Sequence, residues 1–209
     1  MVALPGARRF ASSAVAFVAL ALIAAYVDLA WLNEPLSHHL EPFAGGHGHP
    51  RLREICRVLF EATSPIPSIA LGVGGALLLW QRGMSRAARG WTVALALGFV
   101  AEIGTKLLVR EPGSSGYHMF DLHLDSSFPS GHTLRAVILA GMATTLWPTH
   151  RNWFVGGVVL TAVLLQLTGW HLPVDIIGGL VGGLALSALA MRYQGSTGAE
   201  APAASGSAD

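Results

Sequence analysis

Long apolar runs separated by short polar segments make up most of the chain. Six runs approach the roughly 20 residues that cross the hydrocarbon core of a bilayer: Phe10–Leu32, Ile66–Trp80, Trp91–Val109, Thr133–Trp147, Trp153–Trp170 and Leu172–Met191. The pattern predicts an all-α fold, a bundle of six transmembrane helices, in a single domain over residues 1–194. Residues 195–209 are mainly Gly, Ala and Ser, so we expect a disordered C-terminal tail.

The first run has a second interpretation. Arg8 and Arg9 precede it and Ala24 and Ala25 offer small residues, as in a cleaved signal peptide. The run is longer than the apolar part of a typical signal peptide, which favours an uncleaved first span.

The segment between the first two runs, Asn33–Ser64, is too polar to span a membrane. Part of it repeats apolar residues with the helical spacing i, i+3, i+4, i+7, i+8: Leu52, Ile55, Cys56, Leu59 and Phe60. Charged residues fill the opposite face. This pattern is typical of an amphipathic helix, which would lie either in the membrane interface or packed on the bundle.

Composition supports a membrane protein. Hydrophobic residues make up 52% of the chain and charged residues 12%, whereas a soluble domain carries about 25% charged residues. This excludes an ordinary water-soluble globule, and the hydrophobicity excludes general disorder. A net charge of +1 provides no field for nucleic acid. The single cysteine, Cys56, excludes an intrachain disulfide and a cysteine-based zinc site.

Basic residues near the ends of the runs predict the orientation. A cytoplasmic N-terminus places one set of arginines in cytoplasmic loops and tails: Arg8, Arg9, Arg82, Arg86, Arg89, Arg151 and Arg192. Because basic residues in short loops stay on the cytoplasmic side, we expect a multi-pass plasma-membrane protein with both termini in the cytoplasm.

Polar residues that carry chemistry gather in three distant segments. Lys106 and Arg110 end the third run, 130–132 precedes the fourth, and His171 and Asp175 lie between the fifth and the sixth. Alternation of the spans puts all three segments on the extracytoplasmic side. Since ionisable residues in a membrane are costly and usually functional, we expect one site there.

The sequence Pro129-Ser130-Gly131-His132 is typical of a helix start. Ser130 can cap the helix, Gly131 lets the backbone approach a ligand, and the first N–H groups remain unpaired. Such a helix start favours a bound anion, phosphate above all. His132 adds a titratable donor. An ordinary capped helix with an incidental histidine is the alternative.

Two further pairs share the spacing i, i+4, which brings side chains together on a helix. An Asp175 carboxylate beside His171 would leave one ring nitrogen free as a nucleophile or base, with a purely structural pair as the alternative. Lys106 and Arg110 repel each other unless an anion lies between them; the alternative is snorkelling to lipid headgroups. Glu102, one turn away, is a possible partner of Lys106.

These segments, in this order, resemble the type-2 phosphatidic acid phosphatase superfamily of membrane lipid phosphatases. The motifs of that family are Lys-x6-Arg-Pro, Pro-Ser-Gly-His and Ser-Arg-x5-His-x3-Asp. The second is complete at 129–132, and the end of the third is present as His171-x3-Asp175.

Two departures from the family pattern affect the predicted phosphate site. Arg110 follows Lys106 by four residues instead of seven, and Leu164 and Leu165 stand at the Ser-Arg positions of the third motif. Arg135, one helical turn beyond the second motif, is a candidate replacement for the missing phosphate-binding arginine. A buried ion pair of Arg135 with Asp175 or Glu102 is the alternative.

The resemblance implies a metal-independent hydrolase without a cofactor. His171 would attack phosphorus to form a phosphohistidine, Asp175 would orient His171, and His132 would protonate the leaving oxygen. The phosphoryl oxygens would be held by Lys106, Arg110, Ser130, Gly131 and Arg135. The substrate would be a lipid mono- or diphosphate, and a composition typical of a high-GC bacterium favours a polyprenyl carrier.

Other functions remain open from the sequence. A non-catalytic phospholipid-binding or lipid-translocating protein could share the same scaffold, although binding alone needs no nucleophile. His47-Gly48-His49 and the histidines and aspartates of 117–125 suggest a metal, but neither has a recognised ligand spacing. A vanadate-binding haloperoxidase is disfavoured, because those relatives are of a soluble type.

Overall fold

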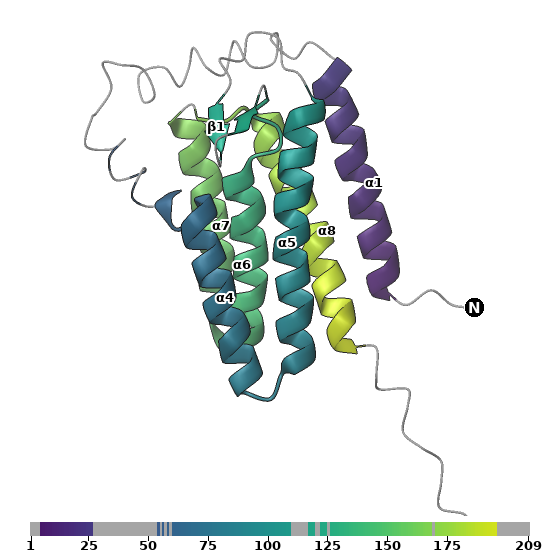
Figure 1. The fold of residues 1–209 in the computed structure, drawn as a ribbon, viewed down its shortest axis with the longest axis vertical. Helices are drawn as coiled ribbons and strands as arrows, with labels where there is room; N and C mark the ends of the chain where they lie inside the picture. The colour runs from purple at the N-terminus through teal and green to yellow at the C-terminus, as the bar shows by residue number, and fades with distance from the viewer. Residues whose placement is uncertain are drawn as a thin grey trace, which may run out of the picture.

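Six helices run along a common direction in the computed structural model, which describes residues 5–26, 54, 56, 58, 60–109, 117–119, 122–124, 126–168 and 170–195. They are α1 (Pro5–Tyr26), α4 (Pro65–Gln81), α5 (Ser85–Leu108), α6 (Gly131–Leu146), α7 (Arg151–Leu167) and α8 (Pro173–Gly195) (Figure 1). A 3₁₀ turn, η1 (Pro148–His150), links α6 to α7. Each helix overlaps one predicted apolar run, which confirms the helical bundle.

Length and composition qualify two of these helices as candidate membrane spans: α5, and α8 over Pro173–Gln194. The apolar stretches Phe10–Ala24 of α1 and Pro65–Gln81 are shorter. The six-span arrangement therefore stays a prediction. The end of the first predicted run, 27–32, and the tail beyond Gly195 lie outside the described residues.

A small hairpin was not anticipated from the sequence. Strands β1 (Tyr117–Met119) and β2 (Leu122–Leu124) pair antiparallel at the end of the bundle where α6 begins (Figure 1). The all-α prediction is correct for the bundle and misses this hairpin, because two strands of three residues leave little periodic signal.

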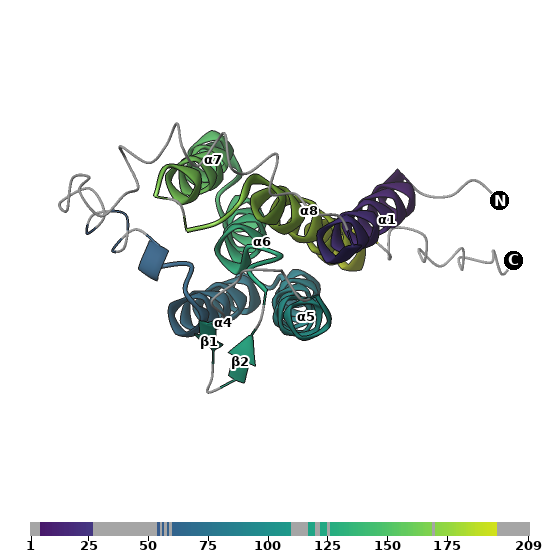
Figure 2. The same ribbon diagram turned by 90° about the horizontal axis from the view of Figure 1, so that it is seen from above.

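Helix α8 makes the most extensive contacts in the described bundle. It packs against α1, α5 and α6, and it lies between α1 and α6 when the bundle is seen from above (Figure 2). Glycines allow this contact: a Cβ at Gly179 would lie 2.5 Å from the Ser130 carbonyl oxygen, and one at Gly183 would lie 2.7 Å from Val137 Cβ. Small residues of this kind let membrane helices approach closely.

The amphipathic segment before α4 packs on the bundle. Cys56 and Phe60 are buried and form an apolar cluster with Leu165 and Ile176. Val58, on the other face, is 63% exposed. The described residues therefore favour the packed helix over one lying free in the interface. Three of the predicted apolar positions, Leu52, Ile55 and Leu59, lie outside the described residues.

Candidate active site

The predicted polar segments meet at one end of the bundle, where α5 ends and α6 and α8 begin (Figure 1). Ser130 is the N-cap of α6, and its hydroxyl oxygen accepts from the backbone N–H of Thr133 at 3.4 Å. The Ser130 N–H in turn donates to the Asp175 carbonyl at 2.9 Å. This backbone bond ties the start of α6 directly to the first turn of α8.

Asp175 is completely buried and accepts two hydrogen bonds at Oδ2. One comes from the Leu172 N–H at 2.9 Å, the other from the Ser127 hydroxyl at 2.7 Å. Pro173 is the first residue of α8. The Asp175 carboxylate reaches back to the Leu172 N–H just before it, as in a capping box. The helix dipole favours negative charge at this position.

His171 lies two residues before the start of α8, with its side chain 11% exposed. Its Nδ1 is 3.5 Å from Asp175 Oδ2, which is within ion-pair range but longer than a hydrogen bond. Both His171 Nδ1 and Asp175 Oδ1 are buried without a hydrogen-bond partner among the described residues. A small ring movement would close this contact, and catalytic hydrogen bonds are often long before substrate binds.

The two histidines face one another across the helix starts. The ring centroids of His132 and His171 are 6.1 Å apart at an interplanar angle of 60°. Two aromatic rings border His132: Phe60 at 5.9 Å and Trp170 at 6.3 Å, measured between centroids. The segment before α4 thus supplies one wall of the site through Phe60, which the sequence did not predict.

Lys106 is buried in the last turn of α5. Its Nζ donates to the Ser127 carbonyl at 3.2 Å and lies 3.8 Å from Glu102 Oε1. The structure therefore confirms the expected Lys106–Glu102 pair. Because Ser127 also bonds Asp175 through its hydroxyl, it connects Lys106 to the His171–Asp175 pair.

Arg135 takes the alternative role considered from the sequence, a buried ion pair. Its Nη1 donates to Glu102 Oε2, its Nε donates to the Thr63 carbonyl at 2.7 Å, and its guanidinium lies over the Phe99 ring at 5.3 Å. Glu102 therefore bridges Lys106 and Arg135. The carboxylate also lies against the start of α6.

Gly131 is required at the first position of α6. A Cβ at this residue would overlap the Glu102 carboxylate. The first N–H groups of α6, from Gly131 and His132, have no partner within the helix. Together with Lys106 they form the part of the site that suits an anion.

The remaining predicted positions are Arg110, the position of the third-motif arginine and the candidate metal ligands. Arg110 lies outside the described residues. Leu165, at the position of the third-motif arginine, is completely buried in the cluster with Phe60. Of the metal alternatives, 47–49 lies outside the described residues, and within the described part of the chain no group of three or more His, Cys, Asp or Glu side chains could hold a metal ion.

Comparison with known proteins agrees with this arrangement. A family model described as the PAP2 superfamily matches residues 105–198, the region from Lys106 through all of α8. The fold resembles a solved structure, "Crystal structure of the first transmembrane PAP2 type phosphatidylglycerolphosphate phosphatase from Bacillus subtilis", with a TM-score of 0.66. That match is 20% identical and covers 90% of this chain and 97% of the other. The region 105–198 belongs to the PAP2 superfamily. No curated protein matches it.

The match to the PAP2 superfamily fits the order of the site residues along the chain. The matched region contains Lys106, the Pro129–His132 motif and the His171–Asp175 pair, all of which meet at one end of the bundle. Beside these residues the structure places the buried Glu102–Arg135 pair, and Leu165 is buried at the position of the third-motif arginine.

Proposed function

We propose that this PAP2 protein is an integral membrane lipid phosphatase. The observation that carries the proposal is the convergence of two histidines, a buried aspartate, a buried lysine and a helix start at one end of the bundle. These groups supply a nucleophile with its orienting carboxylate, a proton donor and an anion site. Those are the parts that phosphoryl transfer requires, because its catalysis depends mainly on positioning and charge stabilisation.

The protein crosses the membrane six times in this proposal, with the site on the extracytoplasmic side. Large apolar side chains exposed on outward faces support contact with lipid: Leu71, Val73 and Leu77 on α4, Val93, Leu97 and Val100 on α5, and Val155, Val159 and Val163 on α7. Exposed arginines at the opposite end of the bundle, Arg82, Arg86, Arg89 and Arg151, support a cytoplasmic location for that end.

The first chemical step uses the His171–Asp175 pair. Asp175 lies on the Nδ1 side of the ring, so it stabilises the tautomer with a proton on Nδ1 and leaves the Nε2 lone pair for attack. The Nε2–P bond forms as the bond from phosphorus to the lipid oxygen breaks. His132 donates a proton to that oxygen, and the product is a phosphohistidine and a free lipid alcohol or phosphate.

The second step releases phosphate. His132, now neutral, accepts a proton from a water molecule that attacks phosphorus, and the Nε2–P bond breaks. Lys106, Arg110, Ser130 and Gly131 hold the phosphoryl oxygens in both steps. Arg135 acts differently: because it is paired with Glu102, it balances the charge of the carboxylate that also lies beside Lys106.

The substrate class is a lipid monophosphate or diphosphate. The solved relative is named a phosphatidylglycerolphosphate phosphatase, and polyprenyl phosphates carry the same reacting group on a different apolar chain. The Phe60 and Trp170 rings beside His132 supply apolar surface where the leaving group of the substrate would lie.

Phosphate release by the purified protein tests the proposal. The panel is phosphatidate, phosphatidylglycerol phosphate, and polyprenyl phosphate and diphosphate, each with and without EDTA. We expect turnover of at least one lipid, unaffected by EDTA and lost in His171→Ala. Binding of these lipids without release of phosphate from any of them would favour the non-catalytic alternative.

A further inference from the structure

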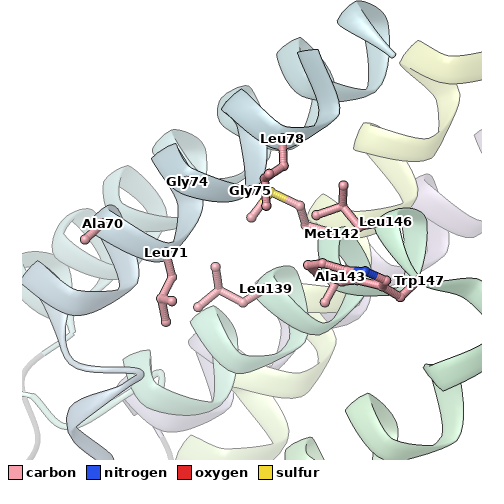
Figure 3. A pocket seen from close by; sticks show the side chains of 10 residues that line it. All are labelled: Ala70, Leu71, Gly74, Gly75, Leu78, Leu139, Met142, Ala143, Leu146 and Trp147. Carbon is pink, nitrogen blue, oxygen red and sulfur yellow. The ribbon is translucent and has the colours of Figure 1, made fainter. Parts of the chain in front are cut away.

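An apolar groove separates α4 from α6 in the half of the bundle away from the candidate site. Its volume is about 350 Å³, and it is lined by Leu71, Leu78, Leu139, Met142, Leu146, Trp147 and smaller residues (Figure 3). Leu71 and Leu78 are 52% and 39% exposed, so the groove opens to the surroundings of the bundle. In the proposed membrane placement, those surroundings are lipid chains.

Two neighbouring glycines of α4 shape this groove in different ways. A Cβ at Gly75 would lie 2.9 Å from Met142 Sδ, so Gly75 lets α4 approach α6. A Cβ at Gly74 would meet nothing within 4 Å. The space beside Gly74 is therefore not filled by the protein. A larger side chain at this position would occupy that space without moving either helix.

A cation lies at the end of the groove. Arg82 follows α4, and its Nη1 donates to the Leu146 carbonyl at 2.6 Å. Its guanidinium lies over the Trp147 ring at 5.4 Å from the centroid. Leu146 and Trp147 also line the groove. Since Arg82 is exposed and a guanidinium has five N–H donors, it can bind a phosphate at this position while capping α6.

The charge at this end of the bundle is positive. Exposed arginines and one histidine lie on the helix ends and the turn at the same end of the bundle as Arg82: Arg86, Arg89, His150, Arg151 and Arg192. Within the described part of the chain, the acidic residues are Glu54, Glu61, Glu102 and Asp175, and all of them belong to the opposite half. Exposed Trp80, Trp147 and Trp153 at this end are typical of a membrane–water interface.

We infer that this groove binds one anionic phospholipid, with an acyl chain beside Gly74 and the phosphate on Arg82. The site is separate from the candidate active site and lies on the proposed cytoplasmic side. The inference uses the proposed membrane placement but not the proposed chemistry. Charge complementarity identifies the occupant, because a negative headgroup at the interface meets arginines, and none of the acidic residues that the structure describes lies at this end.

Native mass spectrometry of the delipidated protein in a neutral detergent tests the inference. The protein is titrated with phosphatidylglycerol and, in parallel, with phosphatidylcholine. We expect one tight phosphatidylglycerol site and weaker phosphatidylcholine binding. Gly74→Leu should weaken phosphatidylglycerol binding at least tenfold, because the leucine side chain fills the groove. Gly156→Leu is the matched control, since its Cβ also meets nothing within 4 Å but lies on α7, away from the groove.

A second pair of variants tests the cation. Arg82→Gln should weaken phosphatidylglycerol binding about fivefold or more. The control is Arg89→Gln: the Arg89 Nε donates to the Ser85 carbonyl of its own helix, and we expect this variant to change phosphatidylglycerol affinity less than twofold.

Ala70→Leu repeats the groove-filling test at another lining position and replaces Gly74→Leu if that variant does not fold. Wild-type affinity in both groove-filling variants would overturn the inference. Equal weakening in Gly74→Leu, Arg82→Gln and their controls Gly156→Leu and Arg89→Gln would also overturn it. Turnover plays no part in this measurement, so its outcome is independent of the proposed activity.

Discussion

The Ser127 hydroxyl donates a 2.7 Å hydrogen bond to Asp175 Oδ2, across 48 residues of sequence. The Ser127 carbonyl accepts from Lys106 Nζ at 3.2 Å. One residue in the segment before α6 therefore holds both the carboxylate beside His171 and the lysine proposed to bind phosphate. This connection makes the position of the nucleophile depend on a residue that belongs to none of the three predicted segments.

Removal of the Ser127 hydroxyl should impair catalysis more than folding. A hydrogen bond to a charged group contributes about 1.5–3 kcal/mol, so we expect Ser127→Ala to lower kcat/KM roughly tenfold or more, mainly through kcat. Ser126→Ala is the matched control, because the Ser126 hydroxyl is buried nearby but accepts from the Phe128 N–H. Equal losses in both variants would show that Ser127 has no specific link to the reaction.

The Glu102–Arg135 pair should contribute to stability as a unit. Removing one partner of a buried ion pair leaves an uncompensated charge and costs about 3–5 kcal/mol, so we expect Arg135→Met and Glu102→Gln each to lower the Tm in detergent. The double variant should recover part of that loss in a double-mutant cycle. Additive losses would indicate that the two side chains act independently.

Arg135→Lys separates this positional role from direct phosphate binding. Lysine keeps the charge beside Glu102 but cannot also donate to the Thr63 carbonyl in the same geometry. We expect a lower Tm with kcat/KM within a few-fold of wild type. A large loss of kcat/KM at unchanged Tm would instead place Arg135 on the phosphoryl group.

Much of this organisation was predictable because membrane helices leave a strong signal. Each of the six described helices overlaps a predicted apolar run, and the pairing of Lys106 with Glu102 followed from helical spacing. The choice between phosphate and Glu102 as the partner of Arg135 was not predictable, since it depends on how α5 and α6 pack. Ser127 and Phe60 were missed for a related reason: their contacts are made between segments whose spatial relation no local pattern encodes.

The contact between α6 and α8 should control the spacing of the two histidines. A Cβ at Gly179 would lie 2.5 Å from the Ser130 carbonyl oxygen and 2.9 Å from Thr133 Cβ. Overpacking of this kind costs about 1–3 kcal/mol, so we expect Gly179→Ala to lower both the Tm and kcat. Gly156→Ala, in open space on α7, should leave both unchanged. A Gly179→Ala protein with wild-type kcat and Tm would mean that the close approach is not needed.

Cysteine labelling tests which end of the bundle faces the cytoplasm. In a Cys56→Ser background, Glu61→Cys marks the end that carries the candidate site and Ser85→Cys marks the opposite end. We expect an impermeant thiol reagent to label Glu61→Cys in intact cells, and Ser85→Cys after permeabilisation. The reverse pattern would place the site in the cytoplasm and change the pool of substrates.

The central claim is that His171 carries the phosphoryl group, and trapping that intermediate tests it most directly. Purified protein is mixed with a lipid substrate labelled in its terminal phosphate and quenched within milliseconds in alkaline denaturant, which preserves phosphohistidine. The account predicts an acid-labile, alkali-stable label on the peptide that contains His171, absent in His171→Ala and retained in Ser126→Ala. Substrate turnover with no label on His171, or turnover by His171→Ala close to the wild-type rate, would contradict it.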